Sequence, residues 1–200
     1  MKKKNLTRIT CVGDSITFGQ GVMLHRGTQA YPAVLEKELG KGYKVSNFGV
    51  MNRTATDVGA HPYTKTKQYT KSLLSEPDIV TIMLGTNDGW QNWVPELFEV
   101  QLANLVRTYQ ALPTHPKVIL MTPCYGYQII PKGLYGPVAG ITKNEVVPLV
   151  RQVAEETGAV LLDVWQETDG RKDWLGFDGV HPNKEGNAVL GKLLAKTVRS

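Results

Sequence analysis

The sequence predicts an α/β fold built around a five-stranded parallel sheet. Apolar stretches of strand length alternate with stretches of helical spacing along all 200 residues, and this alternation is typical of βαβ units. The stretch 79–84 reads Ile-Val-Thr-Ile-Met-Leu without a charged residue, as expected of a strand buried on both faces at the sheet centre. Right-handed crossovers leave few arrangements of five such strands, and the flavodoxin-like order 2-1-3-4-5 is the commonest for this length.

Each expected element has local support in the sequence. Strands are expected at 8–12, 44–48, 79–84, 118–122 and 160–164. Helices are expected at 31–39, 146–156 and 184–198, and over the apolar face formed by Phe98, Leu102, Leu105, Val106 and Tyr109. The signals at helix ends are Gly40 and Gly158 as C-terminal caps, Asn183 as an N-cap, and Pro148, which a helix tolerates only in its first turn.

Length and composition indicate one globular domain spanning residues 1–200. The chain is 42% hydrophobic and 20% charged, and it has no apolar run of the roughly 20 residues that a membrane span requires. The start Met1-Lys2-Lys3-Lys4 leads into a stretch, 6–12, that is too short and too polar for the apolar core of a signal peptide. We therefore expect a cytoplasmic protein, because a secreted or periplasmic location would need a leader ahead of this sequence.

The net charge of +5 does not by itself indicate a nucleic-acid partner. Three of the lysines lie together at 2–4 and the other cationic residues are scattered, so a solvated surface is favoured over a binding patch. Cys11 and Cys124 fall in or beside expected strands, where a free thiol behaves as a small apolar side chain, and no disulfide is implied.

Two polar residues follow neighbouring strands of the expected sheet. Ser15 comes shortly after the first strand and Asn87 after the third. In the order 2-1-3-4-5 these two strands are adjacent where the winding reverses, and ligands of such sheets bind there, at the carboxyl ends of the strands. The topology therefore predicts that Ser15 and Asn87 lie side by side.

Ser15 lies in the run Val12-Gly13-Asp14-Ser15-Ile16-Thr17, at an expected turn from a strand into a helix. At such a turn the hydroxyl is exposed, and free backbone N–H groups favour a developing negative charge. The run differs from the Gly-x-Ser-x-Gly nucleophile elbow of the α/β-hydrolases. Taken alone it is equally consistent with an ordinary N-cap turn.

Two further segments complete a set of catalytic residue types. In Gly85-Thr86-Asn87-Asp88 the Asn87 amide can donate to an oxyanion, although these residues also favour a simple turn. Asp178 and His181 lie three residues apart before Pro182, so that Asp178 can orient one ring nitrogen while the other faces Ser15; alone, this pair could be a loop ion pair. A serine needs a base and the base needs an orienting group, so the three segments together indicate a serine hydrolase.

These segments resemble the SGNH (GDSL-type) hydrolases, and the resemblance covers nearly the whole chain. The residues similar to the first, second, third and fifth family blocks are 13–15, 47–54, 85–88 and 178–182. The resemblance implies a flavodoxin-like α/β/α sandwich with Ser15 as nucleophile, His181 as acid and base, and Asp178 as its orienting partner. It also implies an oxyanion hole formed by the Ser15 N–H, the Asn87 amide and one N–H of the second block.

The second block departs from the family pattern Asn-x-x-x-x-Gly-x-Thr. This chain reads Asn47-Phe48-Gly49-Val50-Met51-Asn52-Arg53-Thr54, with Asn52 at the glycine position. Only the backbone N–H is needed there, and asparagine adopts left-handed conformations better than most residues. Asn52 is therefore the expected third donor, and Gly49 is a less favoured substitute.

Within the family the sequence most resembles carbohydrate esterases, particularly sialate O-acetylesterase-like members. The resemblance implies a short acyl group, acetyl first, on a hydroxyl of a small molecule or glycan. A second hypothesis is a thioesterase or lysophospholipase, which shares the triad but needs an apolar channel for a longer chain. A non-catalytic carbohydrate-binding descendant is the third and is disfavoured, because every triad residue is present. The expected two-step acyl transfer requires no metal or cofactor.

Several other residues have both a functional and a structural interpretation. The candidates for substrate binding are Asp14, Trp90, Trp93, Tyr125 and Tyr127, although core packing is nearly as well supported for the aromatic ones. The segment 123–140 is a candidate pocket wall or lid. Asp163 is interpreted as a cap or loop acid, and His25, His61 and His115 as surface residues, because no cluster has the spacing of metal ligands.

Overall fold

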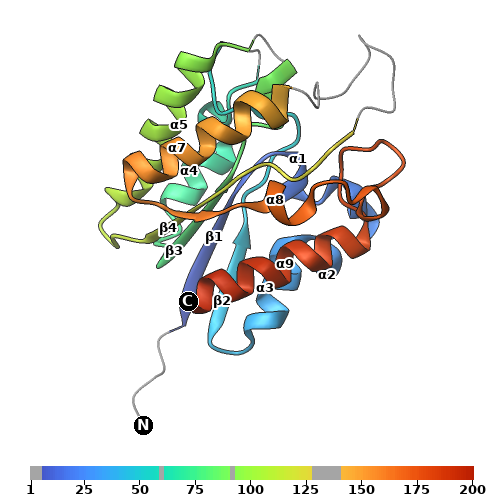
Figure 1. The fold of residues 1–200 in the computed structure, drawn as a ribbon. Helices are drawn as coiled ribbons and strands as arrows, with labels where there is room; N and C mark the ends of the chain where they lie inside the picture. The colour runs from blue at the N-terminus through green and yellow to red at the C-terminus, as the bar shows by residue number, and fades with distance from the viewer. Residues whose placement is uncertain (1–5, 59–60, 91–92, 128–140) are drawn as a thin grey trace.

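A computed structural model describes residues 6–58, 61–90, 93–127 and 141–200, and its centre is a parallel sheet (Figure 1). The strands are β1 (Thr7–Gly13), β2 (Tyr43–Asn47), β3 (Ile79–Met83), β4 (Lys117–Met121) and β5 (Val160–Leu162). Their order is β2-β1-β3-β4-β5, and every neighbouring pair is parallel. The predicted fold class and strand order are thus confirmed.

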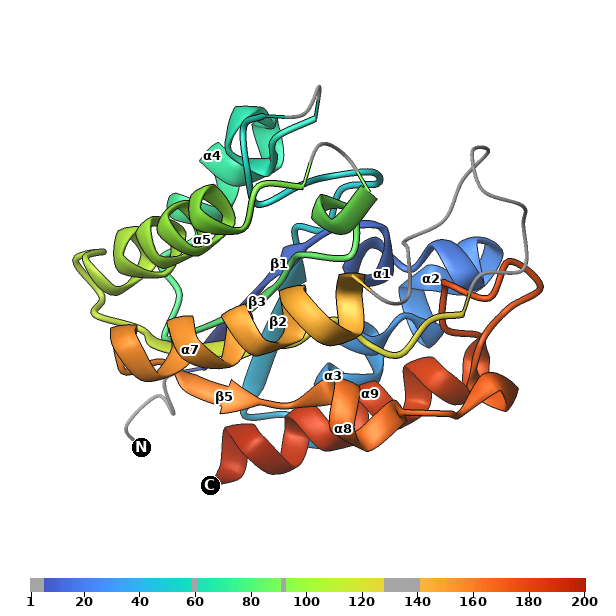
Figure 2. The same ribbon diagram turned by 45° about the horizontal axis from the view of Figure 1, so that its top comes forward.

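Helices cover both faces of the sheet, which gives three layers (Figure 2). One face carries α3 (Tyr31–Leu39) and α9 (Lys184–Arg199), and the other carries α4 (Lys67–Leu73), α5 (Pro95–Gln110) and α7 (Val147–Thr157). Because side chains alternate along a strand, the core divides into two clusters. Cys11 and Met83 pack with the first pair of helices, whereas Val12 and Ile82 pack with α5 and α7.

Short helices and turns fill the connections at the carboxyl end of the sheet. They are α1 (Ser15–Phe18), α2 (Arg26–Gln29) and α8 (Val164–Thr168), the 3₁₀ turns Gln20–His25, Tyr63–Lys65, Asp88–Trp90 and Lys172–Trp174, and the π turn Thr142–Val146. Of these elements only α1 was expected, since Ser15 was predicted to lie at a turn from a strand into a helix; the others and α4 were not predicted. Most are shorter than two helical turns, too short to show an apolar period.

The predicted helix ends agree with the structure. Gly40 and Gly158 follow α3 and α7 with positive φ angles of 80° and 66°, and the Asn183 side chain accepts a hydrogen bond from the Gly186 N–H at the start of α9. Pro148 lies in the first turn of α7. Strand bounds are within a residue or two of those predicted.

The predicted strand 160–164 was too long. β5 ends at Leu162 because the Asp163 side chain accepts from the Gln166 N–H and starts α8. The capping acid therefore converts the last two expected strand residues into the beginning of a helix.

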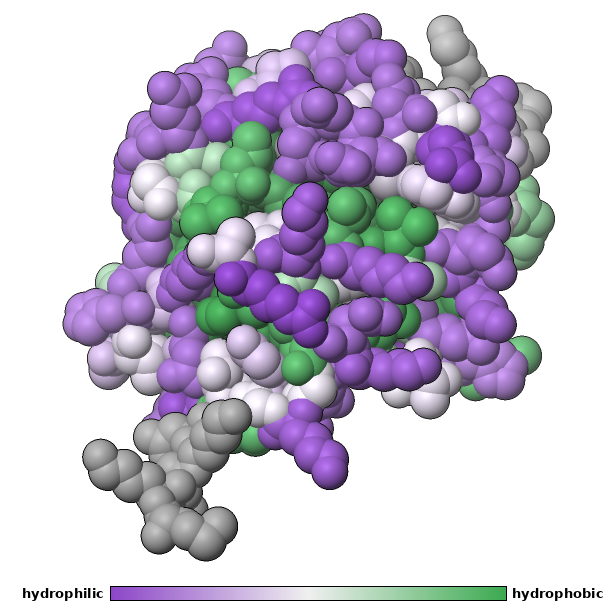
Figure 3. All heavy atoms as spheres, turned by 60° about the horizontal axis from the view of Figure 1, so that its bottom comes forward, coloured by the Kyte–Doolittle hydropathy of each residue, from purple (hydrophilic) through white to green (hydrophobic). Residues whose placement is uncertain are grey.

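One face of the molecule is mostly hydrophilic. Figure 3, which brings the bottom of Figure 1 forward, shows hydrophilic residues over most of that face, with apolar residues grouped between them. Every helix within the described ranges is too short or too polar to traverse a lipid bilayer. Cys11 and Cys124 are buried free thiols, as predicted.

Candidate active site

Ser15 and His181 are in direct contact, although 166 residues separate them in the sequence. Ser15 is the first residue of α1, just beyond the carboxyl end of β1, and its Oγ lies 2.8 Å from His181 Nε2. The Asp14 side chain caps this short helix by accepting a hydrogen bond from the Ile16 N–H at 2.9 Å. The Ser15 N–H lies in the first turn, where helix N–H groups have no intrahelical acceptor.

Asp178 supports the other side of the His181 ring. Its Oδ2 lies 2.7 Å from His181 Nδ1, and its Oδ1 accepts the backbone N–H groups of Val180 and His181, each at 3.0 Å. Partial burial raises the pKa of Asp178, but these three hydrogen bonds outweigh it and hold the pKa at about 2. Asp178 is therefore a carboxylate across the neutral pH range and fixes the ring orientation.

A buried asparagine that the sequence analysis missed anchors the histidine loop. The Asn187 amide donates to the Pro182 and Asn183 carbonyls, at 2.7 and 3.0 Å, and its carbonyl oxygen accepts the Tyr31 N–H at 2.9 Å. This side chain joins the loop to α9 and α3, so His181 is held by tertiary structure as well as by Asp178. Its sequence signal, one polar residue on the apolar face of α9, is faint.

Asn87 contacts Asp14, the residue before Ser15, so the segments that follow β1 and β3 meet as the topology predicted. Strands β1 and β3 pair with Gly13 opposite Met83, so the segments that follow them lie together. The buried Asn87 amide donates to the Arg53 carbonyl at 3.0 Å and, more weakly, to Asp14 Oδ2 at 3.4 Å. Burial is the main cause that raises the pKa of Asp14, to about 6.

The loop 48–56 passes over this end of the sheet, and Asn52 has a left-handed φ of 58° within it. Glycine adopts this conformation freely, and asparagine is among the few other residues that adopt it with little cost. The Gly49 N–H donates to Asn47 Oδ1 at 2.9 Å and is therefore already engaged. Gly49 also has no room for a side chain, because an added Cβ would lie 2.2 Å from the Phe18 nitrogen.

Asp88 is a second buried acid that the sequence analysis did not single out. Its carboxylate accepts the Ala55 N–H at 3.0 Å, the Thr56 N–H at 3.0 Å and the Thr56 hydroxyl at 3.1 Å. Burial is the main cause that raises its pKa, to about 6, against the opposing effect of these bonds. The available signal was its position, directly after Asn87 at the end of the central strand.

The predicted substrate-binding residues have different surroundings. Asp14 is fully buried, and its carboxylate accepts hydrogen bonds from the Ile16 N–H and the Asn87 amide. Trp93 packs against Phe98, with ring centroids 5.1 Å apart, and its Nε1 donates to Glu145 at 2.6 Å, which supports the packing interpretation. The Trp90 side chain lies outside the described residues.

Tyr125 and Tyr127 border the histidine loop. The Tyr127 N–H donates to the Gly179 carbonyl at 2.8 Å, and the two tyrosine rings stack with centroids 6.3 Å apart. Residues 128–140, most of the predicted pocket wall or lid, lie outside the described residues. A substrate contact by any of these aromatic residues stays a prediction.

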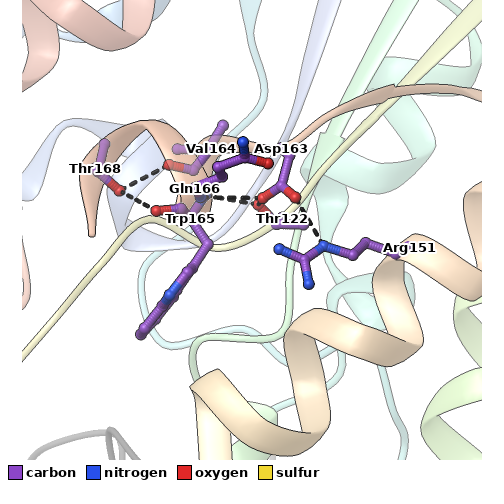
Figure 4. A network of polar contacts seen from close by, with 7 residues as sticks. All are labelled: Thr122, Arg151, Asp163, Val164, Trp165, Gln166 and Thr168. Atoms are coloured by element: carbon purple, nitrogen blue, oxygen red, sulfur yellow. Dashed lines mark hydrogen bonds and ion pairs between the residues drawn. The ribbon is translucent and has the colours of Figure 1, made fainter.

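Asp163 has the structural role that was predicted for it. Figure 4 shows its carboxylate between Arg151 Nε, at 2.7 Å, and the Thr122 hydroxyl, at 3.2 Å, at the start of α8. His25 and His115 are exposed and His61 is half-buried. In the part of the chain that the structure describes, no three His, Cys, Asp or Glu side chains form a group that could hold a metal ion.

The arrangement has the chemical requirements for acyl transfer. A hydroxyl contacts an imidazole, a carboxylate orients that imidazole, and a side-chain amide contacts the residue that precedes the serine. Such a set can remove the hydroxyl proton and stabilise negative charge on a carbonyl oxygen.

Comparisons with known proteins agree with this chemistry. The chain is 30% identical to an acetylxylan esterase from Xylanibacter ruminicola over 98% of its own length, but it spans only 44% of that relative. It is 27% identical to an acetylxylan esterase from Geobacillus stearothermophilus, covering 99% of this chain and 96% of that protein. The structure of an aryl esterase from M. smegmatis has the same fold, with a TM-score of 0.77 at 23% identity over 96% of this chain and 98% of that one.

The family assignment rests on most of the chain. The model of the GDSL-like Lipase/Acylhydrolase family matches residues 11–189, a range that includes Ser15, Asn87, Asp178 and His181. The chain belongs to the GDSL-like lipase/acylhydrolase family.

Proposed function

We propose that this chain is a serine esterase that removes short acyl groups, with acetyl the first candidate, from carbohydrate hydroxyls. The observation that carries the proposal is the continuous chain of contacts from Ser15 Oγ to His181 Nε2, at 2.8 Å, and from His181 Nδ1 to Asp178 Oδ2, at 2.7 Å. The names of the two acetylxylan esterases support the choice of an acetylated carbohydrate.

In the first half of the reaction, His181 takes the Ser15 proton as the hydroxyl oxygen attacks the ester carbonyl. The alcohol then leaves with that proton, and Ser15 carries the acyl group. In the second half, water attacks the acyl group and loses a proton to His181, which returns it to Ser15 Oγ as the bond to the acyl group breaks and the acid leaves. Asp178 stays ionised throughout and holds the imidazole in the tautomer that can accept from serine.

Three donors stabilise the oxyanion in this proposal: the Ser15 N–H, the Asn52 N–H and the Asn87 amide. Of the two bonds that Asn87 donates, the one to Asp14 is long, at 3.4 Å, and the one to Arg53 is short, at 3.0 Å. The proton on the long bond is the easier to redirect, so the oxyanion can take it while Arg53 keeps the amide in place.

The direct test is Ser15→Ala, assayed with p-nitrophenyl acetate. We expect hydrolysis to fall to the uncatalysed background with an unchanged melting temperature, because the hydroxyl makes one side-chain contact. A fluorophosphonate should label the peptide that contains Ser15 in the native chain and not in the variant, and Ser46→Ala on β2 is the matched control. Native activity in Ser15→Ala would reject the proposal.

The acyl group and alcohol are tested separately. We expect kcat/KM to decrease from p-nitrophenyl acetate to the octanoate, and acetylated xylan oligosaccharides to release acetate. A preference for octanoate or for an acyl thioester would instead support a thioesterase or lysophospholipase.

A further inference from the structure

Two consecutive residues at the end of β3 hold a single loop. Asn87 binds the Arg53 carbonyl, and Asp88 binds the N–H groups of Ala55 and Thr56. At the other end of the loop, the Val50 N–H donates to the Gly13 carbonyl at 3.0 Å, so β1 fixes that end. The segment between these attachments contains Asn52.

Asp88 is the strongest of these attachments. It is 1% exposed and receives three hydrogen bonds from two adjacent loop residues, all between 3.0 and 3.1 Å. Hydrogen bonds to an ionised acceptor are roughly twice as strong as those between neutral groups. A buried carboxylate also loses much of its stabilisation when such partners leave, so the loop and Asp88 hold each other in place.

The conformation of Asn52 creates a need for such an attachment. At a φ of 58° asparagine is more strained than glycine, although less strained than most other residues with a Cβ. Strained backbone persists only where the surrounding structure enforces it. Asn52 lies only three residues before Ala55, so the attachment at 55–56 is close enough to enforce it.

We propose that Asp88 is a positioning residue of the active site, which holds Asn52 in the left-handed conformation so that the Asn52 N–H serves as an oxyanion donor. Asp88 acts through Ala55 and Thr56, and it supplies by tertiary contact the conformation that glycine would adopt by itself. This inference rests on the proposed esterase function.

The test is Asp88→Asn, which keeps the shape of the side chain. The oxygen of the new amide can still accept from Thr56, but its NH₂ group faces the Ala55 N–H. Both of these groups are donors, so the hydrogen bond to Ala55 is lost. We expect kcat for p-nitrophenyl acetate to fall about 10²-fold, as for loss of an oxyanion donor, with KM changed less than about threefold.

Two readouts separate positioning from a general loss of structure. A thionoester has sulfur, a weak acceptor, at the carbonyl position, so the ratio of ester to thionoester rates reports on the oxyanion donors; we expect this ratio to fall about tenfold in Asp88→Asn. Asn52→Gly relieves the strain and should restore kcat about fivefold or more in the Asp88→Asn background, with Asn52→Gly alone as the reference rate.

Asp163→Asn is the matched control, because Asp163 is also a hydrogen-bonded acid that follows a strand, with partners just after β4, in α7 and in α8 (Figure 4). It should lower the melting temperature and keep kcat and the thionoester ratio. If Asp88→Asn does not fold, Thr56→Val removes one of the three bonds and should lower kcat by about three- to tenfold, with the same fall in the ratio.

An unchanged thionoester ratio in the folded variant, or no rescue by Asn52→Gly, would overturn the proposal. Ser15→Ala measured in parallel keeps this result distinct from a failure of the esterase assignment. Activity in Ser15→Ala would reject the function, whereas an inactive Ser15→Ala beside a fully active Asp88→Asn would reject only the role of Asp88.

Discussion

The two loops that meet at Ser15 are supported in different ways. The loop 176–183 contains its own main support, because Asp178 binds both the His181 ring and two backbone N–H groups of the same loop. The loop 48–56 depends on residues elsewhere in the chain, chiefly Asn87 and Asp88 at the end of β3. The proposed base, His181, is therefore positioned mainly by its own loop, with Asn187 as a tertiary support. The proposed donor, Asn52, lies in a loop that is held by residues following β1 and β3.

This difference determines how each loop responds to substitution. A carboxylate three residues from its histidine needs only one turn of chain to reach it, so the pair forms wherever that turn forms. Donors that depend on two strand ends require the sheet, the crossover and the loop to be correct together. We call the loop 176–183 the local unit, and the loop 48–56 with Asn87 and Asp88 the non-local unit. Substitutions in the local unit should affect proton transfer alone, whereas those in the non-local unit should affect oxyanion stabilisation.

Asp178→Asn should have the largest effect, because it breaks the local unit at its centre. The asparagine oxygen can still accept from the loop backbone, but its NH₂ group faces His181 Nδ1. That nitrogen must then be unprotonated, so Nε2 carries the proton and cannot accept one from Ser15. We expect kcat to fall about 10⁴-fold with the fold retained, measured with p-nitrophenyl acetate and by circular dichroism.

Asp169→Asn is the control for this experiment, since Asp169 is exposed and pairs with Lys143 at the surface. It should retain native kcat. Retention of more than about a tenth of the activity by Asp178→Asn would contradict the assigned tautomer.

Asn87→Ala tests the non-local unit and should have the second largest effect. It removes a proposed oxyanion donor and also the bond to the Arg53 carbonyl. We expect kcat to fall about 10²- to 10³-fold, equivalent to ~2.7–4 kcal/mol of transition-state stabilisation, with little change in KM. Asn104→Ala, on the exposed side of α5, is the matched control, and a loss confined to KM would indicate substrate binding instead.

The same division explains what the sequence could predict. The alternation of segments and the apolar run 79–84 predicted the sheet and its order, and the order brought the segment of Asn87 next to that of Ser15, where Asn87 contacts Asp14. The Asp178 and His181 contact followed from spacing alone. All of these depend on local pattern or on topology rules with few alternatives.

The features that were missed depend on contacts between distant residues. Asp88 binds residues 32 and 33 positions earlier in the chain, and its letters Asn-Asp also suit an ordinary turn. In the sequence, Asn187 looks like an ordinary polar residue of a surface helix. Its role depends on α3, whose Tyr31 N–H it binds only in the folded chain. The end of β5 was misplaced because Val164 has strand propensity, and the Asp163 cap overrides that propensity.

Asp14, next to Ser15, and Asp178, three residues before His181, have pKa values that are shifted in opposite directions. Asp178 is half-buried and accepts three hydrogen bonds, which hold its pKa at about 2. Asp14 is fully buried, and burial is the main cause of its pKa of about 6. Folding therefore stabilises the ionised form of Asp178 and destabilises the ionised form of Asp14.

Asp14→Asn should have the smallest effect of the three substitutions, and we expect that effect on the free energy of unfolding. Between about pH 4 and 6 the folded chain holds a proton on Asp14 that the unfolded chain releases, so the Asp14 contribution to stability falls as the pH rises through this window. Asparagine caps a helix as well as aspartate and has no charge to bury. The free energy of unfolding of the variant minus that of the native chain should therefore rise from pH 4 to 7, by at most about 3 kcal/mol.

Urea unfolding at both pH values measures this difference. Asp173→Asn is the comparison, because the hydrogen bond from Arg171 lowers the pKa of Asp173, and such an acid contributes stability that is lost only as the pH falls below about 4. This variant should therefore show a constant difference between pH 5 and 7. If Asp14→Asn shows an equally flat profile, then Asp14 is solvated in the folded chain, and the contrast between the two acids does not hold.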